Sequence, residues 1–404
     1  MAEVMNQQRQ DAPSHGVYPA REKLHPRIGI IGGGQLAKMT ALAGLQLGCD
    51  VVVLERSQAS PAATLALHSI VGDWNDPNVL LQLAAQSDVI TLENEFVDAG
   101  ALRVLEASGA RLLPTAQSIA LTQDKFVQKT TLAGAGLPLP VFRKVVTEED
   151  ILNAGRELGW PVVLKTRRNG YDGKGNFTVR SGADVGTGWK HLGAGSAELF
   201  VEAFCPFVKE LAVIITRAQD GASAVYPVVE SVQRDHICHI VMAPAPVAPE
   251  VSARAADLAN RAVAAVGGLG SFGVEMFLLA DGSVLINELA PRVHNSGHYT
   301  IEACECSQFE NHVRAVLGWP LGSTRMIAPA AAMVNLLGVG SGSGWPTGLE
   351  HALALPGVHV HVYGKALAGK GRKLGHVSAL GADVSQAVLR AEAGARLISF
   401  GESS

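Results

Sequence analysis

The sequence predicts an α/β protein with more than one domain. At 404 residues the chain exceeds the size of one ordinary hydrophobic core, so two or three domains are expected. From Arg27 onward, short apolar segments alternate with amphipathic ones, a pattern typical of strands alternating with helices. Hydrophobic residues make up 48% of the chain and charged residues 17%, a composition that allows burial and argues against disorder. The first domain is therefore predicted to contain a parallel, doubly wound sheet.

This first domain is predicted to run from about residue 27 to about residue 114. A glycine turn at Gly32–Gly34 leads into an amphipathic helix that extends through Leu47. Strands are expected at residues 28–31 and 51–55, at a segment closed by Val71, and at residues 89–93.

The glycine turn also matches a dinucleotide fingerprint. Gly32-x-Gly34-x-x-Ala37 follows a strand and opens a helix, and Glu55 ends the next strand about 20 residues later. Such a turn lets a phosphate approach the free N–H groups of a helix N-terminus. Gln35 and Lys38 are unusual residues to face a dinucleotide, however. A nicotinamide oxidoreductase is therefore the less favoured interpretation, and the turn could instead bind a substrate phosphate or pack the helix on the sheet.

The middle of the chain is predicted to change from helix to long strands. A helix around Asp124–Ala133 is followed by a linker at Gly136–Pro140. Further strands are expected at residues 162–165, 198–202, 210–216, 272–279 and 284–288. Gly340–Gly344 is interpreted as a flexible break, and the alternation at His359–Tyr363 predicts a small terminal β unit.

A glycine-rich loop follows the strand that ends at Lys165. Gly170, Gly173 and Gly175 allow the backbone to fold over a polyphosphate and present N–H donors, while Lys165 supplies positive charge. Such a loop is weak evidence by itself. The strand end at Val201–Phe204 strengthens it, because backbone groups and an apolar side chain suit an adenine ring, and Glu210 could accept hydrogen bonds from ribose.

Two acidic residues lie on strands joined by the Asp281-Gly282 turn. Glu275 and Glu288 are predicted to face each other across one sheet, with Asn287 beside them. A single glutamate would be interpreted as a surface ion pair, but a carboxylate pair provides the hard oxygen ligands that Mg²⁺ takes when it bridges phosphates.

The polar run after Glu288 predicts a substrate site. Arg292, His294, Asn295 and Ser296 follow Pro291 within a few residues, and His298 lies just beyond them. This density of polar groups suits a phosphorylated, hydroxyl-rich substrate next to a carbonyl intermediate.

Composition excludes several classes of partner. The net charge of −4 and the absence of a Lys/Arg block argue against nucleic acid, and no apolar stretch is long enough to predict a membrane span. The first 26 residues are polar and lack the apolar core of a signal peptide, so a cytoplasmic protein with a disordered tail is expected. The five cysteines are odd in number and are expected to be reduced, and Cys304-x-Cys306 lacks the spacing of a zinc site.

Four segments resemble those of the 5-(carboxyamino)imidazole ribonucleotide synthases, an ATP-grasp family of purine biosynthesis. They are Gly32–Leu36, Gly170–Gly175, Asn287–Gly297 and Pro356–His376. The resemblance implies a Rossmann-like domain at 27–114, a central ATP-grasp α+β unit at 115–330 with a mobile lid at about 137–205, and a small C-terminal β-rich domain at 331–404.

The family activity that the resemblance implies is an ATP-dependent carbon–nitrogen ligation. The enzyme would use ATP, Mg²⁺ and bicarbonate to carboxylate the exocyclic amine of 5-aminoimidazole ribonucleotide through carboxyphosphate, releasing ADP and phosphate. A homodimer is also implied.

The resemblance assigns roles to particular residues of this sequence. Glu275 and Glu288 would hold Mg²⁺, and Gln35, Ser296, Lys365 and Arg372 would bind the substrate nucleotide. Catalysis would involve Tyr171, Asp172, Lys174, Arg292, His294 and Asn295. ATP would contact Lys125, Lys165, Gly170, Tyr171, Asp172, Gly173, Lys174, Gly175, Asn176, Glu202, Ala203, Phe204, Cys205, Glu210, Gln233, Asn287 and Glu288.

Lys125 and Lys174 stand at positions where this family varies between lysine and arginine, and Gln233 stands where the family usually has a histidine near ATP. The nearest rival functions are other ATP-grasp enzymes, namely formate-dependent glycinamide ribonucleotide transformylase and biotin carboxylase. The His294–Gly297 run and the Lys365–Arg372 segment argue against both. A non-catalytic nucleotide sensor would be expected to have lost Lys165, Glu275 or Glu288, and all three are present.

Overall fold

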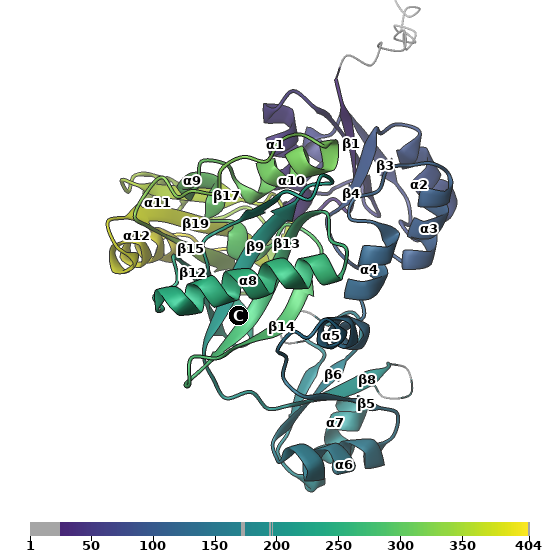
Figure 1. Cartoon of the computed structure of the whole chain (residues 1–404). Helices are drawn as coiled ribbons and strands as arrows, with labels where there is room; N and C mark the ends of the chain where they lie inside the picture. Colours follow the sequence, from purple (N-terminus) through teal and green to yellow (C-terminus); the bar gives the residue numbers. More distant parts are fainter. Residues whose placement is uncertain (1–24, 171–173, 194, 196, 403–404) are drawn as a thin grey trace, which may run out of the picture.

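The computed structural model describes residues 25–170, 174–193, 195 and 197–402, and Figure 1 shows how the elements are arranged. The N-terminal sheet lies at the upper right of Figure 1, a small α/β unit lies below it, and the C-terminal elements lie at the left of a large central sheet. Within these described ranges, no helix is long and apolar enough to cross a membrane.

A four-stranded parallel sheet opens the fold, with the strand order β3-β2-β1-β4. All residues of β1 after Arg27 are buried, since both faces of this sheet are covered. The parallel sheet that the alternation of apolar and amphipathic segments predicted is therefore confirmed. The elements are β1 (Arg27–Ile31), α1 (Gln35–Gln46), β2 (Asp50–Glu55), a 3₁₀ turn (Ala63–Leu65), β3 (His68–Val71), α2 (Pro77–Ala84), β4 (Val89–Leu92) and α3 (Ala99–Ala107).

Two helices, α4 (Ala116–Thr122) and α5 (Lys125–Gly134), lead out of this sheet. Asp124 caps α5 by accepting hydrogen bonds from the amides of Phe126 and Val127, so the helix begins at Lys125. This start places Lys125 and Lys129, one turn apart, along the same side of α5.

A small antiparallel sheet follows, with the strand order β5-β8-β6-β7. Helices α6 and α7 pack against it, and Ile151, Leu164 and Val201 lie in their common core. We refer to residues 142–203 as the small unit. Its elements are β5 (Phe142–Val145), α6 (Glu148–Leu158), β6 (Val162–Thr166), β7 (Asn176–Val179), a 3₁₀ turn (Gly182–Asp184), α7 (Val185–His191) and β8 (Leu199–Ala203).

The largest sheet is antiparallel, with the order β14-β13-β9-β11-β12-β15-β19-β17 and with β10 beside β9. Helix α8 packs on β9 and β14, as Figure 1 shows. The elements before residue 330 are β9 (Phe207–Arg217), β10 (Ser223–Val225), β11 (Val229–Arg234), β12 (Ile237–Ala243), α8 (Pro249–Ala265), β13 (Gly270–Leu279), β14 (Val284–Ala290), a 3₁₀ turn (Asn295–Gly297), α9 (Thr300–Ala303) and α10 (Gln308–Leu317).

The C-terminal residues extend this same sheet, because β15 pairs with β12 and also with β19. The β unit predicted at His359–Tyr363 is β17, which pairs with β19 at the edge of the sheet. The domain boundaries remain predictions. The C-terminal elements are β15 (Ala330–Leu337), β16 (Gly342–Ser343), α11 (Leu349–Leu353), β17 (Val358–Val362), β18 (Leu367–Ala368), β19 (Lys373–Gly381) and α12 (Val384–Arg396).

The interpretation of Gly340–Gly344 as a flexible break was wrong. Gly342 and Ser343 form β16, which pairs with β18. A side chain at Gly344 would place its Cβ 1.7 Å from the backbone oxygen of Lys365. These glycines therefore allow two backbones to approach closely.

The N-terminal sheet and the large sheet meet through one shared core. Helix α1 packs on α10, and Ile28, Phe309, Val313 and Tyr363 lie in the same buried cluster. This core brings together the N-terminal part of α1, Val293 in the segment after β14, and Tyr363 in the segment after β17.

Candidate active site

A cavity of about 1210 Å³ lies where these parts of the chain meet. Its lining includes Gln35 from α1, Lys165 from the small unit, Glu288 from the large sheet, and Lys365 and Arg372 from the C-terminal segment. A cavity of this size with polar groups from several elements suits a site for more than one small molecule.

The β13–β14 hairpin supplies two carboxylates to this cavity. Glu275 and Glu288 are paired directly in the antiparallel register, as the sequence predicted. Burial, then Glu288 and Glu210, raise the pKa of Glu275. Burial acts in the same direction on Glu288, but Lys125, Lys165 and Lys129 together lower the pKa of Glu288. The Lys125 Nζ donates a hydrogen bond of 2.5 Å to Glu288 Oε2.

These acidic residues fit a magnesium ion that is coordinated partly by the protein and partly by phosphate oxygens. The side-chain oxygen of Asn287 is buried next to Glu288 and has no hydrogen-bond partner in the part of the chain that the structure describes. No cluster of three or more His, Cys, Asp or Glu side chains with metal-binding geometry occurs among the described residues. Two carboxylates and one amide oxygen would leave Mg²⁺ to take its remaining ligands from phosphate and water.

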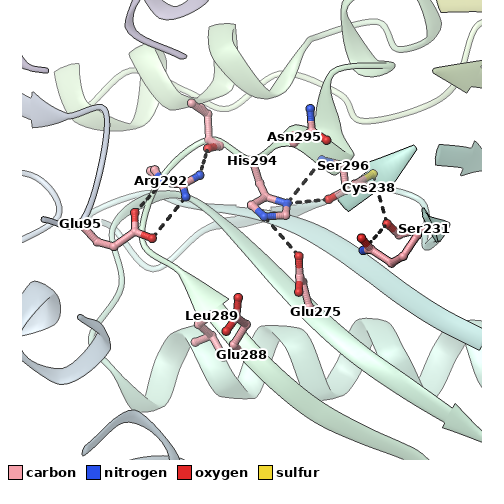
Figure 2. A network of polar contacts seen from close by, with 12 residues as sticks. Glu95, Ser231, Cys238, Glu275, Glu288, Leu289, Arg292, His294, Asn295 and Ser296 are labelled. Carbon is pink, nitrogen blue, oxygen red and sulfur yellow. Dashed lines mark hydrogen bonds and ion pairs between the residues drawn. The ribbon is translucent and has the colours of Figure 1, made fainter. Parts of the chain in front are cut away.

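Polar residues after β14 form the network that Figure 2 shows. Arg292 makes two hydrogen bonds to Glu95, of 2.6 Å from Nε and 3.2 Å from Nη2. His294 lies between Ser296 and Glu275, with its Nδ1 2.8 Å from Ser296 Oγ and its Nε2 3.5 Å from Glu275 Oε1. Burial, with Arg292 and Lys373, lowers the pKa of His294 to about 3, so this imidazole is neutral near pH 7.

A glycine in β13 makes room for His294. A side chain at Gly273 would place its Cβ 2.5 Å from the Cβ of His294. The backbone of His294 is held as well, because its amide donates to Gln308 Oε1 and its carbonyl accepts from Gln308 Nε2. The imidazole is therefore fixed over the hairpin that carries Glu275.

The C-terminal part of the cavity lining is cationic, with Lys365, Lys370, Arg372 and Lys373. Lys365 lies between β17 and β18, and its Nζ donates to the carbonyl of Lys373 at 2.8 Å. Arg372 Nη1 donates to the carbonyl of Leu367 at 2.7 Å. Lys38 of α1 holds the backbone just before Lys365 in place, since its Nζ donates to the carbonyls of Val362 at 3.0 Å and Tyr363 at 3.1 Å.

The glycine turn before α1 carries carboxylates where a dinucleotide pyrophosphate would lie. The amide of Gly33 donates to Glu55 Oε2 at 2.8 Å, and a side chain at Gly34 would place its Cβ 2.2 Å from Glu93 Oε1. Burial raises the pKa of Glu93, whose carboxyl also accepts the backbone amide of Leu36. With these side chains in place, the turn packs the helix on the sheet and does not provide a free anion site.

Comparisons with known proteins agree with this architecture. The ribonucleotide synthetase preATP-grasp domain matches residues 26–123, the ATP-grasp domain matches 130–309, and the phosphoribosylaminoimidazole carboxylase C-terminal domain matches 331–390. The N5-carboxyaminoimidazole ribonucleotide synthase of Synechococcus elongatus is 42% identical over 352 residues, covering 87% of this chain and 88% of that protein. The chain belongs to the N5-carboxyaminoimidazole ribonucleotide synthase family.

Two further relatives extend the comparison. The chloroplastic phosphoribosylaminoimidazole carboxylase of Vigna aconitifolia is 40% identical over 364 residues, but this chain spans only 64% of its length and 89% of its own. The crystal structure of the Aspergillus clavatus synthase with ADP and 5-aminoimidazole ribonucleotide aligns with a TM-score of 0.85 and 36% identity. It covers 92% of this chain and 98% of that one. The fold is therefore that of the synthase family, with its preATP-grasp, ATP-grasp and C-terminal domains.

Most residues to which the synthase resemblance assigns a role line the one cavity. They are Gln35, Lys125, Lys165, Gly170, Lys174, Asn176, Glu202, Ala203, Phe204, Cys205, Glu210, Gln233, Glu275, Asn287, Glu288, Arg292, His294, Asn295, Ser296, Lys365 and Arg372. Gly175 does not line the cavity; a side chain there would place its Cβ 2.3 Å from Thr166 Oγ1, and its φ of +86° favours glycine. Tyr171, Asp172 and Gly173 lie outside the described residues.

Some residues of this synthase site had no signal in the sequence. Glu95 pairs with Arg292, and Lys129, next to the cavity, forms an ion pair with Glu202 and a hydrogen bond to the carbonyl of Asn287. Asn335 exchanges two hydrogen bonds with Asn295 and so fixes the orientation of that amide. His236 lines the cavity three residues after Gln233, whose side chain hydrogen-bonds Glu210. Lys129 falls one helical turn after Lys125, and this i, i+4 spacing is the only one of these relationships that the sequence displays.

Proposed function

We propose that this chain catalyses the ATP- and bicarbonate-dependent carboxylation of the exocyclic amine of 5-aminoimidazole ribonucleotide. The products would be N5-carboxyaminoimidazole ribonucleotide, ADP and phosphate. The observation that carries the proposal is that the predicted triphosphate residues and the predicted nucleotide anchors line one cavity. The Aspergillus clavatus relative, whose structure contains ADP and 5-aminoimidazole ribonucleotide together, supports the same pairing of ligands.

ATP would bind between the small unit and the large sheet. Phe204 and Phe277 line this part of the cavity, and Phe207 stacks on Phe277 with ring centroids 4.6 Å apart, so apolar rings are available to an adenine. Lys165 and Lys125 would face the phosphates. When bound, Mg²⁺ held by Glu275 and Glu288 would neutralise charge on the transferred phosphoryl group.

The first step joins bicarbonate to the γ-phosphoryl group of ATP. A bicarbonate oxygen attacks phosphorus, the bond to the β-phosphate oxygen breaks, and carboxyphosphate and ADP result. Arg292 lies next to the acidic hairpin and carries two hydrogen bonds to Glu95, so its guanidinium is oriented to offset the charge of a carboxyl or phosphoryl group.

The second step transfers the carboxyl group to nitrogen. The exocyclic amine attacks the carboxyl carbon of carboxyphosphate, or carbon dioxide released from it, and inorganic phosphate leaves. The amine must lose a proton. Neutral His294 could accept it through a ring nitrogen, and Asp172 is the other candidate. Lys365 and Arg372 would hold the nucleotide phosphate at the opposite end, and Gln35, Asn295 and Ser296 would contact the substrate between them.

A homodimer, by resemblance to the family, and a cytoplasmic location, expected from the polar first 26 residues, complete the proposal.

The test of this function is ADP release measured with MgATP and bicarbonate, with and without 5-aminoimidazole ribonucleotide. Strong stimulation by the nucleotide, with one equivalent of acid-labile carbon dioxide fixed for each ADP, would support the proposal. ADP release that is indifferent to this nucleotide would contradict it and would direct attention to other amine acceptors.

A further inference from the structure

Lys129 lies beneath the candidate ATP site and is almost fully buried. Its side chain is 2% exposed, and its Nζ donates to the backbone carbonyl of Asn287 at 2.8 Å. The same ammonium forms an ion pair with Glu202. A buried lysine is tolerated when it is paired, so the role of Lys129 depends on its partners Glu202 and Asn287.

Glu202 is shared between two lysines. One carboxylate oxygen contacts Lys129 and the other contacts Lys165, whose side chain is 12% exposed and reaches the cavity. Burial alone would raise the pKa of Glu202, but Lys165 and Lys129 together lower it. Lys129 and Lys165 thus place two ammonium groups against the one carboxylate of Glu202, and the carboxylate of Glu288 also lies near both lysines. Of Lys129, Lys165 and Glu202, the last two line the cavity.

The sharing of the Glu202 carboxylate between Lys129 and Lys165 determines how much positive charge Lys165 presents to the cavity. A carboxylate that faces a single ammonium neutralises it, whereas a carboxylate divided between two ammoniums neutralises each in part. With Lys129 in place, Lys165 keeps charge for a phosphate. Without Lys129, both oxygens of Glu202 are free to turn toward Lys165.

We propose that Lys129 is a positioning residue that prevents Glu202 from neutralising Lys165, so that Lys165 stays available to the polyphosphate of ATP. This inference rests on the proposed binding of ATP in this cavity. Lys129 acts through Glu202 and through the backbone beside Glu288, and it does not touch the nucleotide. Lys129 is 73 residues from Glu202 and 158 residues from Asn287 in the sequence, so only the tertiary fold brings these groups together.

The experiment measures binding of the Mg²⁺ complex of a non-hydrolysable ATP analogue to the full-length protein by calorimetry. Lys129→Met is expected to weaken binding by about 10- to 100-fold, the range for loss of one contact to a charged group. In a Glu202→Gln background, where the carboxylate that could neutralise Lys165 is absent, the same Lys129→Met change is expected to alter analogue binding by less than about threefold relative to Glu202→Gln alone. Lys129→Arg, which keeps the charge, is expected to retain more affinity than Lys129→Met.

The double variant separates this role from a structural one. If Lys129 served only to hold the fold, Lys129→Met would weaken analogue binding as much in the Glu202→Gln background as in the wild type, and that result would overturn the proposal. Should Lys129→Met fail to fold, Lys129→Arg provides the test, because it keeps the charge that holds Glu202 and is expected to bind the analogue within about threefold of the wild type. A loss of about tenfold or more in folded Lys129→Arg would overturn the proposal.

Binding of the analogue does not depend on the carboxylation reaction. A wild-type protein that binds the analogue and shows the expected pattern of variants, yet does not respond to 5-aminoimidazole ribonucleotide, would contradict the proposed function and leave this inference supported. A wild-type protein that does not bind the analogue would overturn the inference.

Discussion

Glu275 and Glu288 lie directly opposite each other on β13 and β14, and their pKa values are displaced in opposite directions. The cause is an uneven distribution of lysines. Lys125 hydrogen-bonds Glu288, whereas Glu275 faces Glu288, Glu210 and a neutral His294. Two carboxylates held in register, with the Lys125 ammonium bonded to Glu288, form a site that a divalent cation would complete.

We expect Glu275→Gln and Glu288→Gln each to raise the Mg²⁺ concentration for half-maximal ADP release by about tenfold or more, because a ligand oxygen loses its charge. Titration of activity with Mg²⁺ at saturating ATP checks this. Glu230→Gln is the matched control, since Glu230 lies in the same sheet, pairs with Lys209 and does not line the cavity. Equal Mg²⁺ dependence in all three variants would contradict the metal assignment.

Replacing the cationic anchors should weaken the substrate nucleotide selectively. Lys365→Met and Arg372→Met are expected to raise the KM for 5-aminoimidazole ribonucleotide by about tenfold or more and to change kcat little, because a phosphate remote from the reacting amine contributes uniform binding. Steady-state kinetics in both substrates checks this. Arg396→Met, an exposed arginine paired with Glu392, serves as the control. A fall in kcat with an unchanged KM would show that these residues are not phosphate anchors.

Lys38→Met should act on the same substrate from a distance. Lys38 donates to the carbonyls of Val362 and Tyr363, just before Lys365, so its loss would release the segment that carries this anchor. The expected result is a rise of about three- to tenfold in the KM for the nucleotide, with the KM for ATP unchanged. The exposed Lys190 provides a Lys→Met control. Equal effects on both substrates would indicate a general loss of structure.

His312 should make stability depend on pH. Burial lowers the pKa of His312 to about 4 from an ordinary value of 6.5. Its Nδ1 accepts the amide of Ser271 and its Nε2 bonds Thr91, so the folded protein holds a neutral ring. The unfolded chain takes up a proton below pH 6.5, so stability is retained above 6.5 and lost as pH falls from 6.5 toward 4, by about 1.4 kcal/mol per pH unit.

Urea unfolding at several pH values in this window measures that slope. His312→Gln is expected to be less stable at pH 7.5 and to show a pH slope that is smaller by about one proton. His359→Gln is the control, because His359 is exposed on β17. A wild-type slope retained in His312→Gln would rule out His312 as its source.

The sequence by itself determined the parts of this protein that depend on local pattern. Alternating apolar segments specified the parallel first sheet, and the Asp281-Gly282 turn joined the two strands that carry Glu275 and Glu288. The same holds for the strand that reaches Lys165 and for the polar run after Glu288. Each lies within a short stretch of sequence whose structure is decided by local hydrogen bonding and periodicity. The register shift between Glu275 and Met276, which places Glu275 opposite Glu288, carries no local signal in the sequence.

Only the tertiary structure decided which polar and charged groups that are distant in the sequence pair with each other. Arg292 meets Glu95 across 197 residues, and Lys38 meets Val362 across 324. The sequence pattern suggested a flexible break at residues 340–344, whereas in the structure these glycines permit two backbone segments to approach closely. Such contacts form because separate elements bury their apolar faces in a common core, and no local signal states which buried lysine will find which carboxylate once that core has formed.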